Sequence, residues 1–159
     1  MNKIYVVLFL LFIGAPTWAS APEIESIADQ KQITIQVDTT ETVKVIGDER
    51  RIRSVLEVLI ENAIAYSPEK SEIHMKIYTQ NNRTHFSITD QGFGVASDEK
   101  KRIFTRFYRS DAAKRADTEG VGLGLAMAKN IIKAHKGRIG VESKGEGQGS
   151  TFWFWIPNK

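Results

Sequence analysis

The chain has 159 residues, which is enough for one domain with a sizeable core and too few for two ordinary domains. Its 22 basic and 19 acidic residues leave a net charge of +3. The sequence contains no Lys/Arg run and no pattern of interleaved aromatic residues of the kind that lines a nucleic-acid groove, so we expect no nucleic-acid partner. The absence of cysteine excludes disulfide bonds, thiolate metal sites and thiol catalysis.

The N-terminal residues differ in composition from the rest. Lys3 precedes an apolar run over residues 4–13, and a small-x-small site ends at Ala21, which is the layout of a signal peptide cleaved after that residue. The run is shorter than the roughly 20 residues of a bilayer span, and a short signal anchor is the alternative. We therefore divide the chain into a signal peptide or short membrane anchor over 1–21, a linker or helix stub over 22–31, and a globular domain over 32–159.

The globular domain opens with strands. Alternating apolar residues predict a half-buried strand over 32–37, and 43–46 is a shorter second strand. Asp48 is a good N-cap for a helix whose apolar residues share one face and which ends before Pro68.

A hairpin and a short helix are expected next. Residues 72–79 and 84–89 alternate between apolar and polar and are separated by a turn rich in Asn, so they predict a hairpin. Ser97 can cap a short helix that runs to Phe104.

The C-terminal part alternates between irregular and regular segments. Residues 109–119 lack periodicity and apolar side chains larger than alanine, so we interpret them as a mobile loop. A helix over 122–136 with Gly137 as its C′ residue precedes strands over 138–143 and 150–156. Strands thus come in pairs between helices. The predicted fold class is α/β, a two-layer sandwich in which a mixed sheet carries its helices on one face.

Three alternate glycines, Gly120, Gly122 and Gly124, lead directly into the last predicted helix. Glycine lets a backbone approach a ligand closely, and the first turn of a helix has unpaired N–H groups at the positive end of its macrodipole. Such a loop can hold a phosphate, although by itself it is also an ordinary glycine-rich turn before a helix.

Three further pieces stand in a fixed order with this loop. Asn62, at the edge of a helix face, offers an amide oxygen for a hard cation such as Mg²⁺, or is simply a solvated helix residue. Asp90 precedes Gly92 and Gly94 and can accept a hydrogen bond from the exocyclic amine of a flat ring; an ordinary Asp-Gly turn is the alternative. The last piece is a glycine-rich stretch that ends at Ser150 and is otherwise a hairpin loop.

In this order and spacing the pieces resemble the N, G1, G2 and G3 boxes of the ATP-binding catalytic domain of bacterial sensor histidine kinases, and residues 103–109 resemble their F box. The resemblance covers about residues 32–157, so we expect 32–159 to be a histidine-kinase-like ATPase domain. It implies the Bergerat ATP fold shared with gyrase, Hsp90 and MutL, with ATP and Mg²⁺ as cofactors. By position it implies Asn62 as the Mg²⁺ ligand, Asp90 as the adenine reader, Gly92 and Gly94 as the floor of the base pocket, Arg109 and the backbone of Gly120, Gly122, Leu123 and Gly124 at the phosphates, and Ser150 as a support for Asp90, acting directly or through water.

Two positions depart from the pattern of the family. Val58 stands where these kinases usually carry another Asn and where gyrase-like ATPases carry the glutamate that activates water, which argues against the hydrolase branch. Glu61 projects away from the apolar face and does not replace it. Ala65 stands where the kinases often place a lysine near the phosphates. Lys114 or Arg115 could supply the missing charge, and solvated loop charges are the simpler interpretation.

The acceptor histidine of these kinases lies on an upstream helical hairpin that has no counterpart in this sequence. His74 and His85 fall in strands and His135 at a helix end, so none is expected to accept a phosphate. We expect a catalytic domain of a two-component sensor histidine kinase that phosphorylates histidine only on a partner chain, with a response regulator as a candidate partner downstream; whether it is an active enzyme stays open. The alternatives are a non-catalytic ATP-binding module or truncated kinase remnant, and an anti-sigma-factor-like serine kinase.

Two signals bear on location. Lys3 before the run 4–13, and acidic residues after it, favour export of the body, whereas an ATP site needs the cytosol. We expect a membrane-associated protein, attached through residues 4–13, with its ATP domain in the cytosol. Export after cleavage at Ala21 is the alternative.

Overall fold

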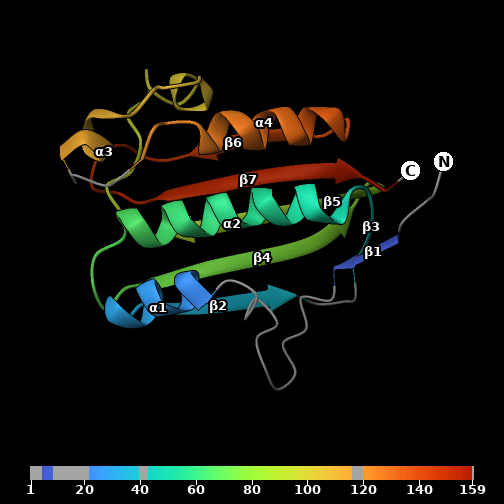
Figure 1. Ribbon diagram of the computed structural model, residues 1–159, viewed down its shortest axis with the longest axis horizontal. Coiled ribbons are helices and arrows are strands. Elements are labelled where there is room, and N and C mark those ends of the chain that lie inside the picture. Colours follow the sequence, from blue (N-terminus) through green and yellow to red (C-terminus); the bar gives the residue numbers. More distant parts are fainter. Residues whose placement is uncertain (1–4, 9–21, 40–42, 116–119, 159) are drawn as a thin grey trace.

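A five-stranded sheet with helices on one face forms the body of the protein in the computed structural model (Figure 1). The structure describes residues 5–8, 22–39, 43–115 and 120–158. In their order across the sheet the strands are β2 (Thr34–Thr39), β4 (Glu72–Gln80), β5 (Arg83–Asp90), β7 (Ser150–Pro157) and β6 (Arg138–Glu142). The three longest helices are α1 (Pro22–Gln30), α2 (Glu49–Tyr66) and α4 (Gly124–Ala134). The predicted two-layer α/β sandwich is confirmed.

The sheet is mixed, as predicted. β2 runs parallel to β4, whereas the pairs β4–β5, β5–β7 and β7–β6 are antiparallel. A parallel pair needs a crossover, and here the chain passes through α2 between β2 and β4. The C-terminal strand β7 lies between β5 and β6, so its first residue, Ser150, pairs with Asp90 at the end of β5.

A separate two-stranded sheet joins β1 (Tyr5–Leu8) to β3 (Val43–Ile46) in antiparallel register. The predicted strand over 43–46 therefore forms, outside the main sheet. β1 falls within the run predicted to be a signal peptide or anchor, while Ala21 and the rest of that run lie outside the described residues. None of the helices in the described parts of the chain is long and apolar enough to cross a membrane.

α2 forms as its sequence predicts. Asp48 caps it by accepting a hydrogen bond from the backbone N–H of Arg51 at 3.1 Å, and the helix ends at Tyr66, two residues before Pro68. Its apolar face is buried against the sheet, whose centre is formed by the stacked rings of Phe86 and Phe154, 4.5 Å apart. The buried residues of this face are Ile52, Val55, Leu56, Leu59, Ala63 and Ile64.

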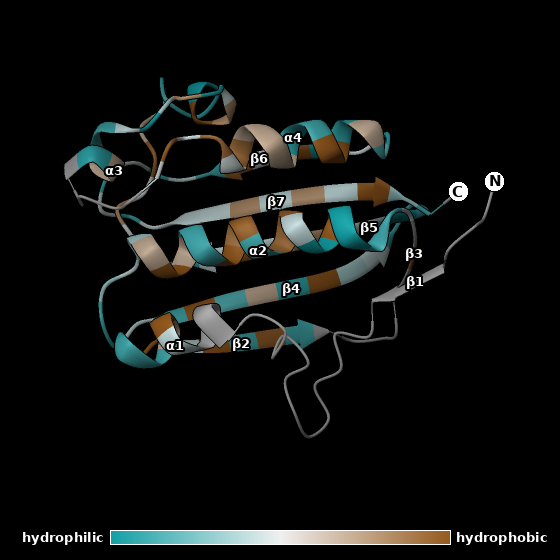
Figure 2. Cartoon of the chain, in the orientation of Figure 1, coloured by the Kyte–Doolittle hydropathy of each residue, from teal (hydrophilic) through white to brown (hydrophobic). Residues whose placement is uncertain are grey.

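The β4–β5 hairpin is also confirmed. Asn81 and Asn82 at its tip have φ of +50° and +58°, the left-handed conformation that a two-residue type I′ turn requires and that Asn tolerates. Burial alternates along both strands, and Figure 2 shows hydrophobic and hydrophilic segments alternating along β4. This period-two pattern places one face of the hairpin under the helices.

One segment decides between two alternatives, and another differs from the prediction. The segment expected to be a linker or a helix stub forms the nine-residue helix α1, whose Ala28 is buried in the core, so the helix is the alternative observed. The short helix expected from Ser97 is reduced to the 3-10 helix η1 (Arg102–Phe104), which no side chain caps. Its backbone begins instead at the carbonyl of Glu99, which accepts the N–H groups of Arg102 and Ile103.

The end of α4 is shifted by one position from the prediction. Lys136, rather than Gly137, has the left-handed conformation, with φ of +58°. Its N–H donates to Lys133 O and the N–H of Gly137 donates to Ile132 O, each at 2.9 Å, which is the Schellman pattern. The helix therefore ends as a capped element, although the C′ residue was predicted wrongly.

Candidate functional site

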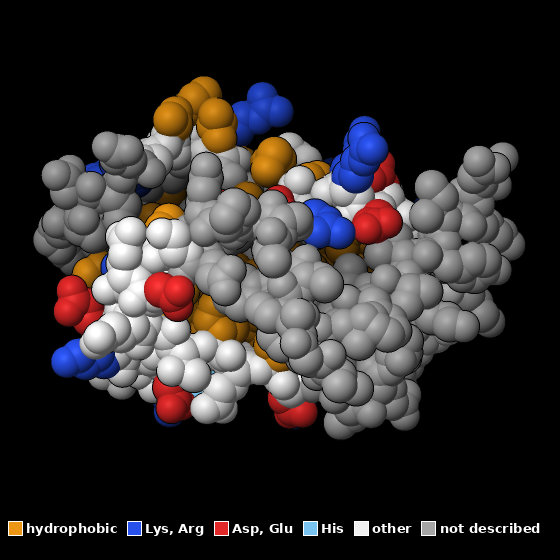
Figure 3. All heavy atoms as spheres, turned by 60° about the horizontal axis from the view of Figure 1, so that its bottom comes forward, with side chains coloured by type: hydrophobic (Ala, Val, Ile, Leu, Met, Phe, Trp, Pro, Cys, Tyr) orange, Lys and Arg blue, Asp and Glu red, His pale blue; other side chains and the backbone are white. Residues whose placement is uncertain are grey.

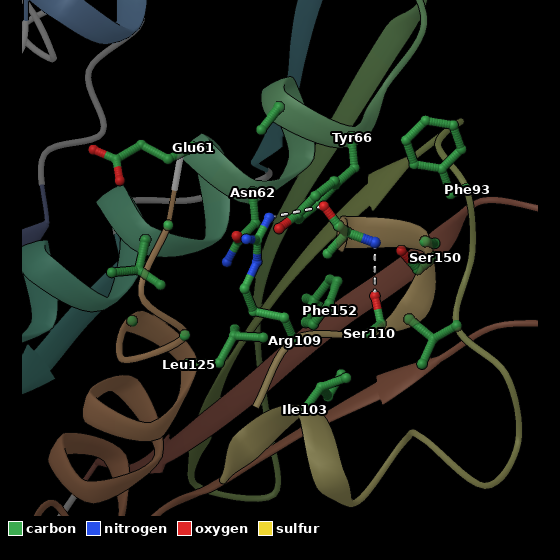
Figure 4. A pocket seen from close by; sticks show the side chains of 18 of the residues that line it. Glu61, Asn62, Tyr66, Phe93, Ile103, Arg109, Ser110, Leu125, Ser150 and Phe152 are labelled. Atoms are coloured by element: carbon green, nitrogen blue, oxygen red, sulfur yellow. Dashed lines mark hydrogen bonds between the residues drawn. The ribbon is translucent and has the colours of Figure 1, made fainter. Parts of the chain in front are cut away.

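A cleft of about 440 Å³ lies between α2, the adjoining ends of β5 and β7, and the segment that leads into α4 (Figure 4). Every predicted site residue except Gly92 lines it. These lining residues are Asn62, Asp90, Gly94, Arg109, Gly120, Gly122, Leu123, Gly124 and Ser150. Segments that the sequence separates by almost the whole domain are thus brought to one place.

Asp90 is a buried carboxylate at the end of β5, with 5% of its surface exposed. Its Oδ1 accepts the backbone N–H groups of Gly92, at 2.8 Å, and of Ser150, at 3.2 Å, while Oδ2 accepts the Ser150 hydroxyl at 2.7 Å. Burial raises the pKa of Asp90, and the hydrogen bonds from Ser150 and Gly92 lower it without cancelling that effect. Ser150 therefore supports Asp90 directly, without an intervening water.

The pattern of bonds leaves a specific place for a ligand donor. An oxygen of a carboxylate has two lone pairs, and both of those on Asp90 Oδ1 are occupied by protein N–H groups. Oδ2 accepts the Ser150 hydroxyl and has capacity for one more hydrogen bond. A ligand that bonds to Asp90 would accordingly do so at Oδ2.

The two glycine-rich segments beside Asp90 fit against each other. The N–H of Gly147 donates to Phe93 O at 2.6 Å, and the N–H of Gly149 donates to Gly92 O at 3.1 Å. Gly94 has φ of +70°, and a Cβ there would overlap the carbonyl oxygen of Gly145. Close approach between these backbones therefore shapes the wall of the cleft. Gly92 does not line the cleft itself but donates its N–H to Asp90, which does.

The helix α4 begins in the cleft at Gly124, two residues later than predicted. Its N-cap residue, Leu123, has no side-chain hydrogen bond to the helix, and the first turn contains no acidic residue. The N–H groups of a first helical turn have no acceptor within the helix, and the macrodipole makes that end positive. This end of the cleft is therefore suited to an anion.

Gly122 is needed for a reason that the sequence did not show. It has φ of +75°, its carbonyl accepts the N–H of Phe107 at 2.9 Å, and a Cβ on it would lie 2.7 Å from Tyr108 O. The close neighbour of Gly122 is thus the backbone of the protein itself. Gly120, by contrast, has open space where a Cβ would be.

α2 contributes Asn62 and both of the departing positions, Val58 and Ala65, to the lining. The Cγ1 of Val58 lies 3.1 Å from the position of a Cβ on Gly124, so Val58 packs against the first residue of α4. Glu61 is exposed and points away from Asn62 in Figure 4, although it too lies at the rim of the cleft. The departing position Val58 thus presents an apolar side chain to the cleft, as its sequence dictates.

The segment predicted to be a mobile loop contains the short helix α3 (Asp111–Arg115); residues 116–119 lie outside the described part. The hydroxyl oxygen of Ser110 accepts the N–H of Ala113 at 3.1 Å, which caps the helix. Arg109 donates to Ala113 O at 2.9 Å, and in Figure 4 its side chain extends toward Asn62. Lys114 pairs with Asp111 at 2.9 Å and does not line the cleft, so it does not replace the missing lysine.

Several lining residues were not predicted. They are mainly apolar or aromatic, and apart from Ile103 and Tyr108, which belong to the segment that resembles the F box, their types gave no signal beyond that of a core residue. One of them, Tyr108, donates its hydroxyl to Glu99 Oε1 at 2.8 Å, and burial together with this bond raises the pKa of the hydroxyl. The additional lining residues are Tyr66, Phe93, Val95, Ile103, Tyr108, Ser110, Ala112, Ala113, Val121, Leu125 and Phe152.

None of the three histidines lines the cleft. His74 lies 3.3 Å from Glu72, and His85 stacks on Tyr78 with 4.9 Å between ring centroids. His135 accepts the backbone N–H of Asp48 at 3.0 Å through Nε2, while Nδ1 lies 2.8 Å from a backbone carbonyl of α4. All three are thus engaged away from the cleft.

Within 5–8, 22–39, 43–115 and 120–158, no group of three or more His, Cys, Asp or Glu side chains is placed to hold a metal ion. A hard cation at Asn62 would therefore take most of its ligands from a bound molecule and water. On the face in Figure 3, the coloured Lys/Arg and Asp/Glu side chains are interspersed, so the described residues visible there form no single-sign basic patch.

The chain is similar to known proteins in both sequence and fold. The family model described as "Histidine kinase-, DNA gyrase B-, and HSP90-like ATPase" matches residues 47–159. The chain belongs to this family. Its matched segment contains the whole cleft described above, from α2 to β7.

Curated relatives and solved structures narrow the likeness to histidine kinases. The sensor-like histidine kinase SenX3 of Mycolicibacterium smegmatis is 38% identical over 130 residues, which cover 82% of this chain and 34% of SenX3. The catalytic domain of histidine kinase ThkA superposes with a TM-score of 0.81 at 26% identity, covering 99% of this chain and 97% of that one. Full-length ShkA in complex with AMPPNP gives a TM-score of 0.77 at 28% identity, covering 99% of this chain and 32% of ShkA. The chain thus spans about a third of the length of SenX3 and corresponds to the ATP-binding catalytic domain of these kinases.

Proposed function

We propose that the cleft binds ATP with Mg²⁺ and that the domain transfers the γ-phosphoryl group to a histidine on a partner chain. One observation carries this proposal: the same cleft contains two features that suit the two parts of a nucleotide. One is the buried carboxylate of Asp90, which is fixed by hydrogen bonds, and the other is the N-terminus of α4, which no side chain caps. The first suits the amine of adenine and the second suits phosphate. Phosphoryl transfer asks a protein mainly for such positioning and for charge neutralisation.

The base would lie at the Asp90 end of the cleft. Asp90 Oδ2 would accept the exocyclic amine of adenine, and the apolar side chains of Val95, Ile103 and Phe152, all lining residues, would contact the ring. A site built to pair a donor with a buried acceptor discriminates against bases that lack that donor. Adenine is therefore preferred over hypoxanthine or guanine in this proposal.

The triphosphate would extend toward α4. Arg109 and the backbone of Gly120 and Gly124 line that side of the cleft, and Asn62 on α2 would hold Mg²⁺ through its amide oxygen. The bound cation would offset the charge of the phosphate oxygens. Val58 and Ala65 also line the cleft, and as apolar side chains neither would offer a charge or a hydrogen bond to the phosphates.

The surface beside the cleft suits a helical partner that carries the acceptor. Phe107 and Val121 are 70% and 69% exposed, and Leu123 and Met127 are 43% and 45% exposed. Backbone bonds between Phe107 and Gly122, and between Met127 and Leu123, hold these positions near one another. An apolar face of a helical hairpin would cover these side chains and bring its histidine to the cleft. A response regulator is a candidate partner for the phosphorylated hairpin.

Incubation of the purified protein with radiolabelled ATP and Mg²⁺ tests the proposal. We expect the protein alone to retain no acid-labile phosphate, since none of its histidines lines the cleft. An added hairpin domain from a related kinase should become labelled slowly. Efficient self-labelling that disappears on His74→Gln, His85→Gln or His135→Gln would contradict the proposal.

Two other functions would give different results in the same assay. Tight ATP binding without labelling of any hairpin would favour a binding module, which the apolar Val58 and Ala65 already favour. An acid-stable phosphoserine on the partner would favour a serine kinase.

We also propose that residues 4–13 attach the protein to a membrane with the ATP domain in the cytosol, and cell fractionation with protease protection tests this directly.

A further inference from the structure

Glu99 is a buried carboxylate beside the cleft that no sequence motif singled out. Only 7% of its surface is exposed, and it does not line the cleft. Its Oε1 accepts two hydrogen bonds, from the hydroxyl of Tyr108 at 2.8 Å and from the backbone N–H of Asp111 at 3.1 Å. A carboxylate in such a place needs donors, and here both donors come from the segment that borders the cleft.

The main chain of Glu99 is itself firmly placed. Its N–H donates to Ala96 O at 3.0 Å, and its carbonyl accepts the N–H groups of Arg102 and Ile103 at 2.8 and 3.0 Å. These bonds begin η1, whose Ile103 and Phe104 are buried in the core. The carboxylate is therefore held by the packed part of the domain rather than by a mobile loop.

The two residues that donate to Glu99 stand on either side of two residues that line the cleft. Arg109 and Ser110 stand between Tyr108 and Asp111 and both line the cleft. Arg109 donates to Ala113 O at 2.9 Å, and Ser110 accepts the Ala113 N–H at 3.1 Å, so the segment and the first turn of α3 form one hydrogen-bonded unit. A single oxygen of Glu99 thus fixes both ends of the stretch that carries Arg109.

We propose that Glu99 is a positioning residue that holds Arg109 and the start of α3 against the phosphate end of the cleft. The inference rests on the proposed function, because it assigns Arg109 to the phosphates of ATP. Glu99 acts through its two hydrogen bonds and not through contact with the nucleotide. Its effect should therefore appear with phosphate-bearing ligands and not with adenosine.

The test compares Glu99→Leu, which removes the acceptor at similar volume, with Glu99→Gln, whose amide oxygen can still accept both bonds. Asp98→Leu removes a neighbouring exposed carboxylate and is the matched control. Kd for ATP and for adenosine is measured by calorimetry on the purified protein. Glu99→Leu should weaken ATP about tenfold and adenosine by less than about twofold, while Glu99→Gln stays within about threefold for both.

A double-mutant cycle with Arg109→Ala shows whether Glu99 acts through that residue. In the Arg109→Ala background, Glu99→Leu should add less than about twofold to the Kd for ATP, because the side chain that it positions is absent. Tyr108→Phe removes one of the two bonds without touching the buried carboxylate, and should weaken ATP by about threefold. This variant keeps the test open if Glu99→Leu does not fold.

Three results would overturn the inference: equal losses for ATP and adenosine, equal losses for the Gln and Leu variants, or full additivity with Arg109→Ala. Failure of the proposed function would appear differently, as wild-type protein that binds neither ATP nor adenosine. Amide hydrogen exchange in the nucleotide-free protein then still tests the placement. Protection of the Asp111 amide should fall in Glu99→Leu and persist in Glu99→Gln, and unchanged protection in the Leu variant would refute the role of Glu99.

Discussion

Replacing Asp90 with Asn changes one oxygen of a buried carboxylate into an NH₂ group and removes its charge. The amide oxygen can remain at the Oδ1 position and keep the bonds from the N–H groups of Gly92 and Ser150. The Ser150 hydroxyl, which donates to Oδ2 at 2.7 Å, can turn and accept from the new NH₂ group. The fold around position 90 should therefore survive the substitution.

The cost of Asp90→Asn falls on the ligand. Because Oδ1 is fully occupied, the amine of adenine would bond at the Oδ2 position, where the variant presents a donor to a donor. An unmatched buried donor costs about 1–3 kcal/mol, which corresponds to roughly a five- to 150-fold increase in Kd. We expect ATP to bind at least about tenfold more weakly.

Calorimetry with ATP and with inosine triphosphate measures this directly, since the latter carries a carbonyl oxygen in place of the amine. Wild-type protein should prefer ATP. The Asn variant should lose that preference, because its NH₂ group can donate to the carbonyl. Asp98→Asn, at an exposed carboxylate, is the control and should change neither value. Equal affinity of wild type and Asp90→Asn for ATP would refute the adenine assignment.

The same variant has a consequence for stability. Burial raises the pKa of Asp90 above its ordinary value of 3.8, so the native state holds the proton more tightly than the unfolded chain does. The stability that depends on the protonated form is present below 3.8 and is lost as the pH rises through the folded pKa. Asn has no proton to lose. The melting temperature of Asp90→Asn minus that of the wild type should therefore be more positive at about pH 7 than at about pH 3. The opposite trend would contradict the effect of burial.

The remaining predictions concern the cation, the glycine loop and the end of α2. Asn62→Ala should weaken ATP more in the presence of Mg²⁺ than in EDTA, and equal losses would make Asn62 a structural residue. Gly120→Ala should preserve the melting temperature and weaken the binding of ATP more than that of adenosine. Gly122→Ala should instead destabilise the fold by about 1 kcal/mol or more, because φ is +75° at this position and a Cβ would lie 2.7 Å from a backbone oxygen. The amine of Lys31 donates to three carbonyl oxygens at the end of α2, at 2.8, 2.9 and 3.3 Å. Lys31→Met should therefore lower the free energy of unfolding, measured in urea, by about 1–3 kcal/mol. Lys70→Met, at an exposed position, is the control and should leave it unchanged.

Local patterns predicted the elements whose stability depends on local chemistry. The cap at Asp48, the stop before Pro68 and the turn at Asn81 and Asn82 all depend on residues close in sequence, and all are observed. Local patterns failed at α3, which has five residues and is too short for a periodic signal. They also misplaced the left-handed residue after α4, because Lys136 adopts that conformation in spite of its Cβ.

The sequence by itself predicted Asn62, Asp90 and the glycine loop as site residues, and the structure brings all of them to one cleft. Only the tertiary structure decided how they are held. The bond from Ser150 to Asp90 joins residues 60 positions apart, and it exists because β7 enters the sheet between β5 and β6. Glu99 reaches Asp111 for a similar reason, since η1 places a carboxylate against a segment with no pattern of its own. Periodicity reports which face of an element is apolar, whereas a buried polar contact depends on which elements meet, and that is set by the packing of the whole chain.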